Sequence, residues 1–175
     1  YAGLRYRLKT GIFTFTPGFT AHAYSINNTQ FGGSKMYEDS FYKFLPEFET
    51  IAQFKRSESL TFRYKQEVNF TDVNQLAEGL VANSYNNFFY GNNNLMNGTN
   101  QSTSLNYSNF NLYNGTSMFA LLRHTKSIDQ IGSIANFIPG SNVSTRTNQN
   151  LPFDTESILA IASFSKTFKK IRTKE

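Results

Sequence analysis

The stretch from Leu60 to Phe70 alternates between apolar and polar side chains. Its even positions are apolar or aromatic except for Gln66, and its odd positions are all polar. A period of two over this length predicts a β-strand with one apolar and one polar face. The strand is longer than the usual five or six residues. It reaches the roughly 9–11 residues that a strand needs to cross a bilayer, with its apolar side toward lipid.

Similar alternation, or a composition rich in aromatic and β-branched residues, recurs along the chain. Pro17-Gly18 predicts a kink or bulge inside the predicted strand of residues 12–26. Together they predict an all-β fold, an antiparallel up-and-down meander of about seven strands that forms part of a large transmembrane β-barrel. The predicted strands are residues 1–9, 12–26, 43–54, 60–70, 102–110, 116–128 and 155–168.

The connections between these strands alternate in length. Short turns are predicted at 10–11, 55–58 and 111–115, and long polar connections at 27–42, 71–98 and 129–153. A helical turn is predicted at 72–76, and Asn114-Gly115 is a strong hairpin signal. In a meander, all short turns then lie at one end of the sheet and all long loops at the other. Outer-membrane barrels have this asymmetry, whereas a soluble sandwich has no general reason for it, although functional loops can gather at one end.

Composition supports strands over helices. The chain is 39% apolar and 16% aromatic, with 18 Phe and 10 Tyr. No apolar run approaches twenty residues, so no transmembrane helix is predicted, which leaves a membrane barrel open. The chain has no Cys and therefore no disulfide framework. It shows no signal peptide, and Tyr1 lies within an alternating segment, so we expect a mature or internal fragment.

The formal net charge is +5, which alone could suggest an anionic partner. The basic residues are scattered, so no nucleic-acid partner is expected. The exception is a cluster near the end of the chain, made of Lys166, Lys169, Lys170, Arg172 and Lys174.

Several short motifs resemble those of one protein family. A proline-initiated strand is followed by a charged turn, a strand, an I/V-x-Q-L element and a G-N-x-N-L motif, before the next outgoing strand. This order is similar to the barrel of TonB-dependent outer-membrane receptors, in particular the Bacteroidetes-type outer-membrane β-barrel family. The matching segments are Leu45-Pro46-Glu47-Phe48, Ser59 to Lys65, Val73-Asn74-Gln75-Leu76, Gly91-Asn92-Asn93-Asn94-Leu95 and Gly115 to Ala120.

The resemblance implies a barrel of about 22 strands, of which residues 1–175 would form roughly the third quarter, without the plug domain, the TonB-contacting segment or the terminal strand. Met96-Asn97-Gly98 replaces the family's usual Lys-Pro-Glu, which leaves the path of that loop open. The implied location is the bacterial outer membrane. The implied partners are outer-membrane lipid, the remainder of the barrel and its plug, and indirectly the TonB system.

No catalytic arrangement is apparent. His22 and His124 lie on different predicted strands without a metal-binding spacing. Glu47 and Glu49 share a strand face and could do acid–base chemistry, but cross-strand ion pairs with Arg63 or Lys65 are the favoured interpretation. We therefore predict no enzyme activity, no metal and no cofactor.

The receptor hypothesis gives two sets of candidate residues. Aromatic and amide side chains on a long loop suit polar ligands, or else pack on neighbouring segments at the membrane interface. The alternatives to the receptor hypothesis as a whole are a soluble, secreted β-sandwich that binds glycans or a surface, and a β-rich hydrolase. The ligand-binding candidates are Tyr85, Asn86, Asn87, Phe88, Phe89, Tyr90 and Asn92, and the candidate lumen-facing charges are Arg5, Arg7, Glu47, Glu49, Arg63, Lys65 and Glu67.

Overall fold

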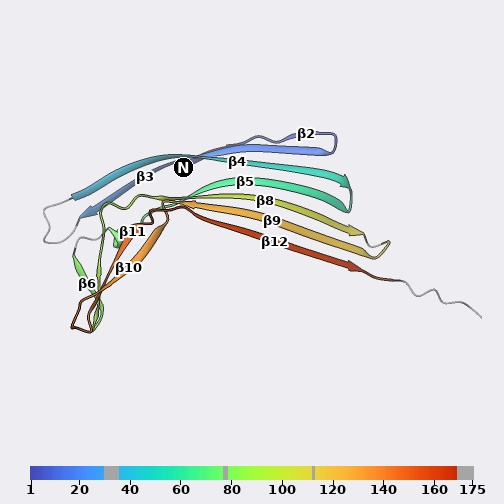
Figure 1. The fold of residues 1–175 in the computed structure, drawn as a ribbon. Coiled ribbons are helices and arrows are strands. Elements are labelled where there is room, and N and C mark those ends of the chain that lie inside the picture. Colours follow the sequence, from blue (N-terminus) through green and yellow to red (C-terminus); the bar gives the residue numbers. More distant parts are fainter. Residues whose placement is uncertain (30–35, 77–78, 112, 169–175) are drawn as a thin grey trace, which may run out of the picture.

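The computed structural model of the chain describes residues 1–29, 36–76, 79–111 and 113–168 (Figure 1). Most of the basic cluster predicted near the end of the chain, from Lys169 to Lys174, lies outside the described residues. Among the residues that are described, no helix is long and apolar enough to cross a membrane. A short 3-10 helix, η1 (Val73–Gln75), falls within the helical turn predicted at 72–76.

One large antiparallel sheet contains most of the chain and confirms the predicted meander. Its order is β1-β3-β4-β5-β8-β9-β12, with β2 also paired to β3. Each strand pairs with its predecessor in this order, and the short turns lie at one end (Figure 1). The strands are β1 (Ala2–Arg5), β2 (Leu8–Thr10), β3 (Phe13–Thr29), β4 (Met36–Lys55), β5 (Glu58–Asn69), β8 (Gly98–Asn111), β9 (Thr116–Ile128) and β12 (Thr155–Lys166).

β1 and β2 correspond to the single strand predicted over residues 1–9. Arg5 pairs with Gly18 and Leu8 pairs with Phe15, so the register is the same on both sides of the break. The ladder is interrupted opposite Pro17, which has no N–H to donate. The bulge that the sequence predicts at Pro17-Gly18 is not found in β3, because β3 pairs with β4 there without a register shift. The irregularity is in the partner strand instead.

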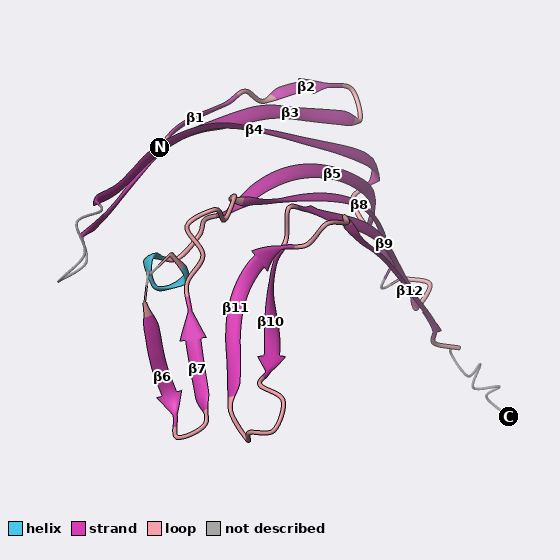
Figure 2. Cartoon of the chain, turned by 60° about the vertical axis from the view of Figure 1, so that its left-hand side comes forward, coloured by secondary structure: helices cyan, strands magenta, loops and turns pink. Residues whose placement is uncertain are grey.

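The long polar connection predicted at 27–42 is wrong. β3 continues to Thr29 and β4 begins at Met36, and the two pair over this whole length. The polar side chains carried no alternating signal here, but cross-strand backbone hydrogen bonds form between polar residues equally well. The β3–β4 hairpin therefore extends well beyond β5 (Figure 2).

The other two long connections contain a second sheet that was not predicted. Its order is β10-β11-β7-β6, and β11 pairs with β7 in parallel. The large sheet arches over this small sheet (Figure 2). Its strands are β6 (Leu80–Ser84), β7 (Asn87–Tyr90), β10 (Ile131–Phe137) and β11 (Ser144–Asn150).

Pairing across the large sheet defines two faces. Residues that pair directly point to the same side, and Phe62 falls in one row with Phe15, Thr50 and Leu105. We call this side the apolar face. Many of its large side chains remain exposed in the described chain, from 36% for Phe62 to 82% for Tyr42. They include Phe13, Phe19, Phe44, Phe62, Leu105, Leu122 and Ile158.

The small buried core joins the second sheet to the opposite, polar face. Leu76 is 1% exposed and Leu95 is 4% exposed, and Tyr24 and Ile131 pack against them. Tyr24 lies on the same face of β3 as Thr20 and His22, because side chains alternate along a strand. The two leucines that end the I/V-x-Q-L and G-N-x-N-L motifs thus attach the long connections to the polar side of the large sheet.

Candidate functional site

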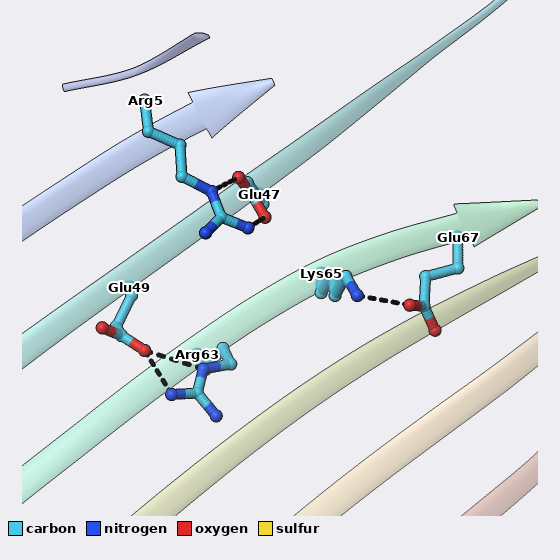
Figure 3. A network of polar contacts seen from close by, with 6 residues as sticks. All are labelled: Arg5, Glu47, Glu49, Arg63, Lys65 and Glu67. Carbon is cyan, nitrogen blue, oxygen red and sulfur yellow. Dashed lines mark hydrogen bonds and ion pairs between the residues drawn. The ribbon is translucent and has the colours of Figure 1, made fainter. Parts of the chain in front are cut away.

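Six of the seven predicted lumen-facing charges lie together on the polar face (Figure 3). Three of them share one row, which runs from Arg5 through Gly18 and Glu47 to Lys65. The adjacent row contains Glu49 and Arg63. Because side chains alternate along β4 and β5, these charged side chains all lie on the same face of the sheet.

Arg5 reaches across β3 to Glu47 on β4. Its Nη2 donates to Glu47 Oε2 at 2.6 Å, and its Nε donates to Oε1 in a bidentate pair (Figure 3). Gly18 on β3 makes this possible, because a Cβ there would lie 2.8 Å from both Arg5 Cγ and Glu47 Oε1. A residue with no side chain between two strands lets the ion pair lie flat on the sheet.

Replacing Gly18 with valine is expected to abolish the coupling between Arg5 and Glu47. A double-mutant cycle on denaturant unfolding measures this coupling, which is expected to be small and favourable for an exposed bidentate pair. In the Gly18→Val background the coupling should fall to about zero, since the side chains can no longer meet. Thr16→Val on the same face is the control and should preserve it. An unchanged coupling in Gly18→Val would show that the pair does not depend on the glycine.

The predicted pairing between Glu49 and Arg63 is confirmed, with Arg63 Nε donating to Glu49 Oε2 at 2.8 Å. Glu47 lies opposite Lys65 in the register, but it binds Arg5. Lys65 instead forms an ion pair with Glu67, two residues along the same strand. Each of the three carboxylates on this part of the face therefore has its own cationic partner.

Two adjoining polar hollows are lined by these groups. The first has a volume of about 330 Å³ and lies over Arg5, Glu49 and Arg63. The second, about 280 Å³, lies where β4 and β5 separate after Glu47 and Lys65. Pro46 is the next residue on β4 and lacks the N–H that would continue the ladder. The arrangement offers charged and hydrogen-bonding groups to a ligand.

Arg7 lies between β1 and β2, where the register on both sides sets it opposite Thr16. Its side chain is exposed, and it forms no ion pair with any residue that the structure describes. It belongs to the same face as Arg5 but stands outside the network in Figure 3.

The aromatic and amide run of the long connection forms the β6–β7 hairpin. Tyr85 is 94% exposed at its turn, and Tyr90 is 52% exposed at the end of β7. Phe88 and Phe89 are half-buried in the middle of the small sheet. Asn92 donates from Nδ2 to the carbonyl of Asn148 on β11 at 3.0 Å. The candidate residues are thus divided between exposed positions at the hairpin and positions that hold the sheet together. Asn86 belongs to the second group through its carbonyl, and Asn87 is half-buried.

Sequence reasoning missed two asparagines, of which Asn150 joins the two long connections and Asn97 joins the two ends of the first. Asn150 Nδ2 donates to the carbonyls of Met96 at 2.8 Å and Asp129 at 2.7 Å, and its Oδ1 accepts from Met96 N. Asn97 Oδ1 accepts from both the backbone and the hydroxyl of Thr71. In a chain so rich in Asn, no local signal distinguishes these residues from surface ones.

The two histidines lie on opposite faces of the large sheet. His22 is on the polar face, stacked on Tyr1 at 5.4 Å between ring centroids and tilted against Phe70 at 6.0 Å. His124 is on the apolar face near the long connections, 3.6 Å from Glu156. Across the described ranges, no group of three or more His, Cys, Asp or Glu side chains could hold a metal ion.

Comparison with known proteins finds likeness in structure only. No protein-family model matches the sequence, and no curated protein matches it. Among solved structures, the haemophore receptor HasR of Serratia marcescens, in complex with its haemophore HasA and haem, matches 88% of this chain with a TM-score of 0.64 at 11% identity. The match covers 29% of that receptor's chain. The fold of this chain is therefore that of a β-sheet segment of such a receptor.

Proposed function

We propose that the chain is a wall segment of a TonB-dependent outer-membrane receptor that imports a large nutrient. The observation that carries this proposal is the pair of faces on the large sheet. One face exposes aromatic and aliphatic side chains over six strands, and the other carries the charged network. A transmembrane barrel wall needs both, one toward lipid and one toward a watery lumen.

The position of the small sheet argues against a soluble sandwich. In a sandwich, the second sheet packs on the apolar face of the first at about 10 Å. Here the connecting segments attach through Tyr24, on the polar side. Phe44 on the apolar face remains 61% exposed and Leu122 49% exposed. Lipid is the solvent that suits such a face.

In the proposed mechanism, the long connections capture the ligand and the lumen passes it. Tyr85 and Tyr90 offer exposed rings for contact on the outer side, and the charged network with Arg7 lines the route. Energy comes from the inner membrane through the TonB system, and no covalent chemistry is involved. The positions of Leu76 and Leu95 in the core give the two family motifs a structural role, which supports the Bacteroidetes-type assignment.

The small sheet, which we call the outer platform, supports the proposal of a large ligand. The complex of HasR contains a protein haemophore, and the small sheet of this chain, with its hairpin ends at Tyr85 and Phe137 both strongly exposed, offers a surface of the kind that contacts a large partner.

Electrophoretic mobility and intact mass of the native protein test this proposal. Protein extracted from the outer-membrane fraction is expected to be far larger than 19.9 kDa. It should migrate faster unheated than after boiling, because a closed barrel stays folded in detergent until heated. A soluble species near 19.9 kDa, with no heat-dependent shift, would overturn the receptor proposal in favour of the secreted sandwich.

A further inference from the structure

We propose that the cargo passing along this wall is anionic, carrying carboxylate, phosphate or sulfonate groups. This inference rests on the proposed function, since it assigns a charge class to the ligand of the same polar face. It comes from the excess of cations on that face after its ion pairs are counted, and from the way charges on the opposite face are compensated.

Cations outnumber carboxylates on the polar face of the large sheet. Among the strand residues with described side chains, Glu47, Glu49 and Glu67 are the carboxylates. The register assigns twice as many cations to this face. They are Arg5, Lys9, Lys43, Arg63, Lys65 and Arg123.

The carboxylates are all used within the network, which binds Arg5, Arg63 and Lys65. Lys9, Lys43 and Arg123 are left, all exposed, and none forms an ion pair with another described residue. Arg7, between β1 and β2, adds to them. The face therefore presents unpaired positive charge that is already accessible to solvent.

Arg123 gives this excess a location. It pairs with Ser104, which in turn pairs with Arg63, so the two arginines share a row and their backbones lie two strands, about 10 Å, apart. The carboxylate of Glu49 binds Arg63 from the side of β4, which is the side away from Arg123. Arginine presents a fork of donors that matches carboxylate and phosphate oxygens. Ser104 marks the place between them where an anion can lie.

On the apolar face, two of the three cations on described strand residues, Lys55 and Lys126, have carboxylate partners, and the third, Lys166 at the end of β12, lies over the ring of Phe168 at 5.4 Å. Lys126, on the same strand as Arg123 but on the other face, binds Asp154 at 3.0 Å and Glu156 at 3.2 Å. Near the short turn, Lys55 lies 3.5 Å from Glu58. A surface lined by one sign of charge between low-dielectric walls concentrates ions of the opposite sign. Such a wall favours entry of anions and disfavours cations.

Reaction rates of a cysteine at Ser104 measure this potential directly. The full-length protein carries Ser104→Cys, with any other cysteines replaced by serine, and is taken from preparations that show the heat-dependent shift. It is treated with anionic 2-sulfonatoethyl and cationic 2-(trimethylammonium)ethyl methanethiosulfonate. The ratio of the two rates is divided by the same ratio for 2-mercaptoethanol. We expect a ratio of about 10 in favour of the anionic reagent at low salt, falling toward one at 1 M salt.

Arg123→Gln should lower this ratio several-fold, whereas the matched control Lys126→Gln on the opposite face should leave it unchanged. A ratio at or below one, or equal effects of the two substitutions, would overturn the anionic assignment. Absence of reaction with either reagent would overturn it as well, because the face would then be closed to cargo. Since only protein that passes the heat-shift test is used, these outcomes leave the receptor proposal standing.

Discussion

Replacing Phe62 with arginine is expected to destabilise the folded protein in lipid by about 2–4 kcal/mol, the cost of a cation near the bilayer midplane on the lipid side of a barrel. Phe62 is 36% exposed on the apolar face, tilted against Phe48 with ring centroids 6.3 Å apart. Its row also contains Phe15, Thr50 and Leu105, so an arginine there has no carboxylate partner within the row.

The adjacent residue is the matched control. Thr61 lies on the polar face, between Ile51 and Asn106, and Thr61→Arg should change stability by less than about 0.5 kcal/mol because its charge stays in water. Refolding into vesicles at increasing urea gives the free energy of unfolding for both variants. Similar losses at the two positions would mean that the faces are assigned wrongly.

The strands of the large sheet were predictable because one face of the sheet is apolar and the other polar, which imposes a period of two. The meander follows from turn signals such as Thr10-Gly11 and Asn114-Gly115, whose glycines adopt positive φ angles of 56° and 63°. In the outer parts of β3 and β4 the alternation in the sequence stops, although the two backbones continue to pair. Sequence alternation therefore predicted the sheet but not its full height.

The small sheet illustrates a different limit. Every side chain of β11 (Ser144–Asn150) is polar, so no hydrophobic pattern distinguishes this strand from a loop. Its parallel pairing with β7 joins segments more than fifty residues apart, beginning where Ser144 N donates to the carbonyl of Asn86 at 2.8 Å. Such pairing depends on where the large sheet places the two connections, which local sequence does not encode.

Within the site, adjacency of strands was the predictable part. Glu49 and Arg63 are on neighbouring strands, and their pairing follows from the register of one hairpin. The Arg5–Glu47 pair spans an intervening strand and depends on Gly18 having no side chain. That contact requires knowledge of three strands at once, so pattern reasoning on one hairpin assigned Glu47 to the wrong partner.

We expect the small sheet to open without unfolding of the large sheet, and Leu76 is the residue that tests this. Its side chain is 1% exposed and packs with Leu95, Tyr24 and Ile131, which come from three other parts of the chain. Leu76→Ala removes buried methyl groups and leaves a cavity, which costs about 2–5 kcal/mol. The large sheet has its own ladders, so the loss should fall on the small sheet.

Hydrogen exchange of backbone amides separates the two sheets. In Leu76→Ala, amides of β7 and β11 should exchange about 30-fold or more faster, the factor that corresponds to 2 kcal/mol of local opening, while amides of β5 stay protected. Leu80→Ala, at a position 61% exposed on β6, is the control and should change little. Equal acceleration in both sheets would show one cooperative unit. In the proposed receptor, a platform that opens separately is what allows ligand capture without weakening the barrel wall.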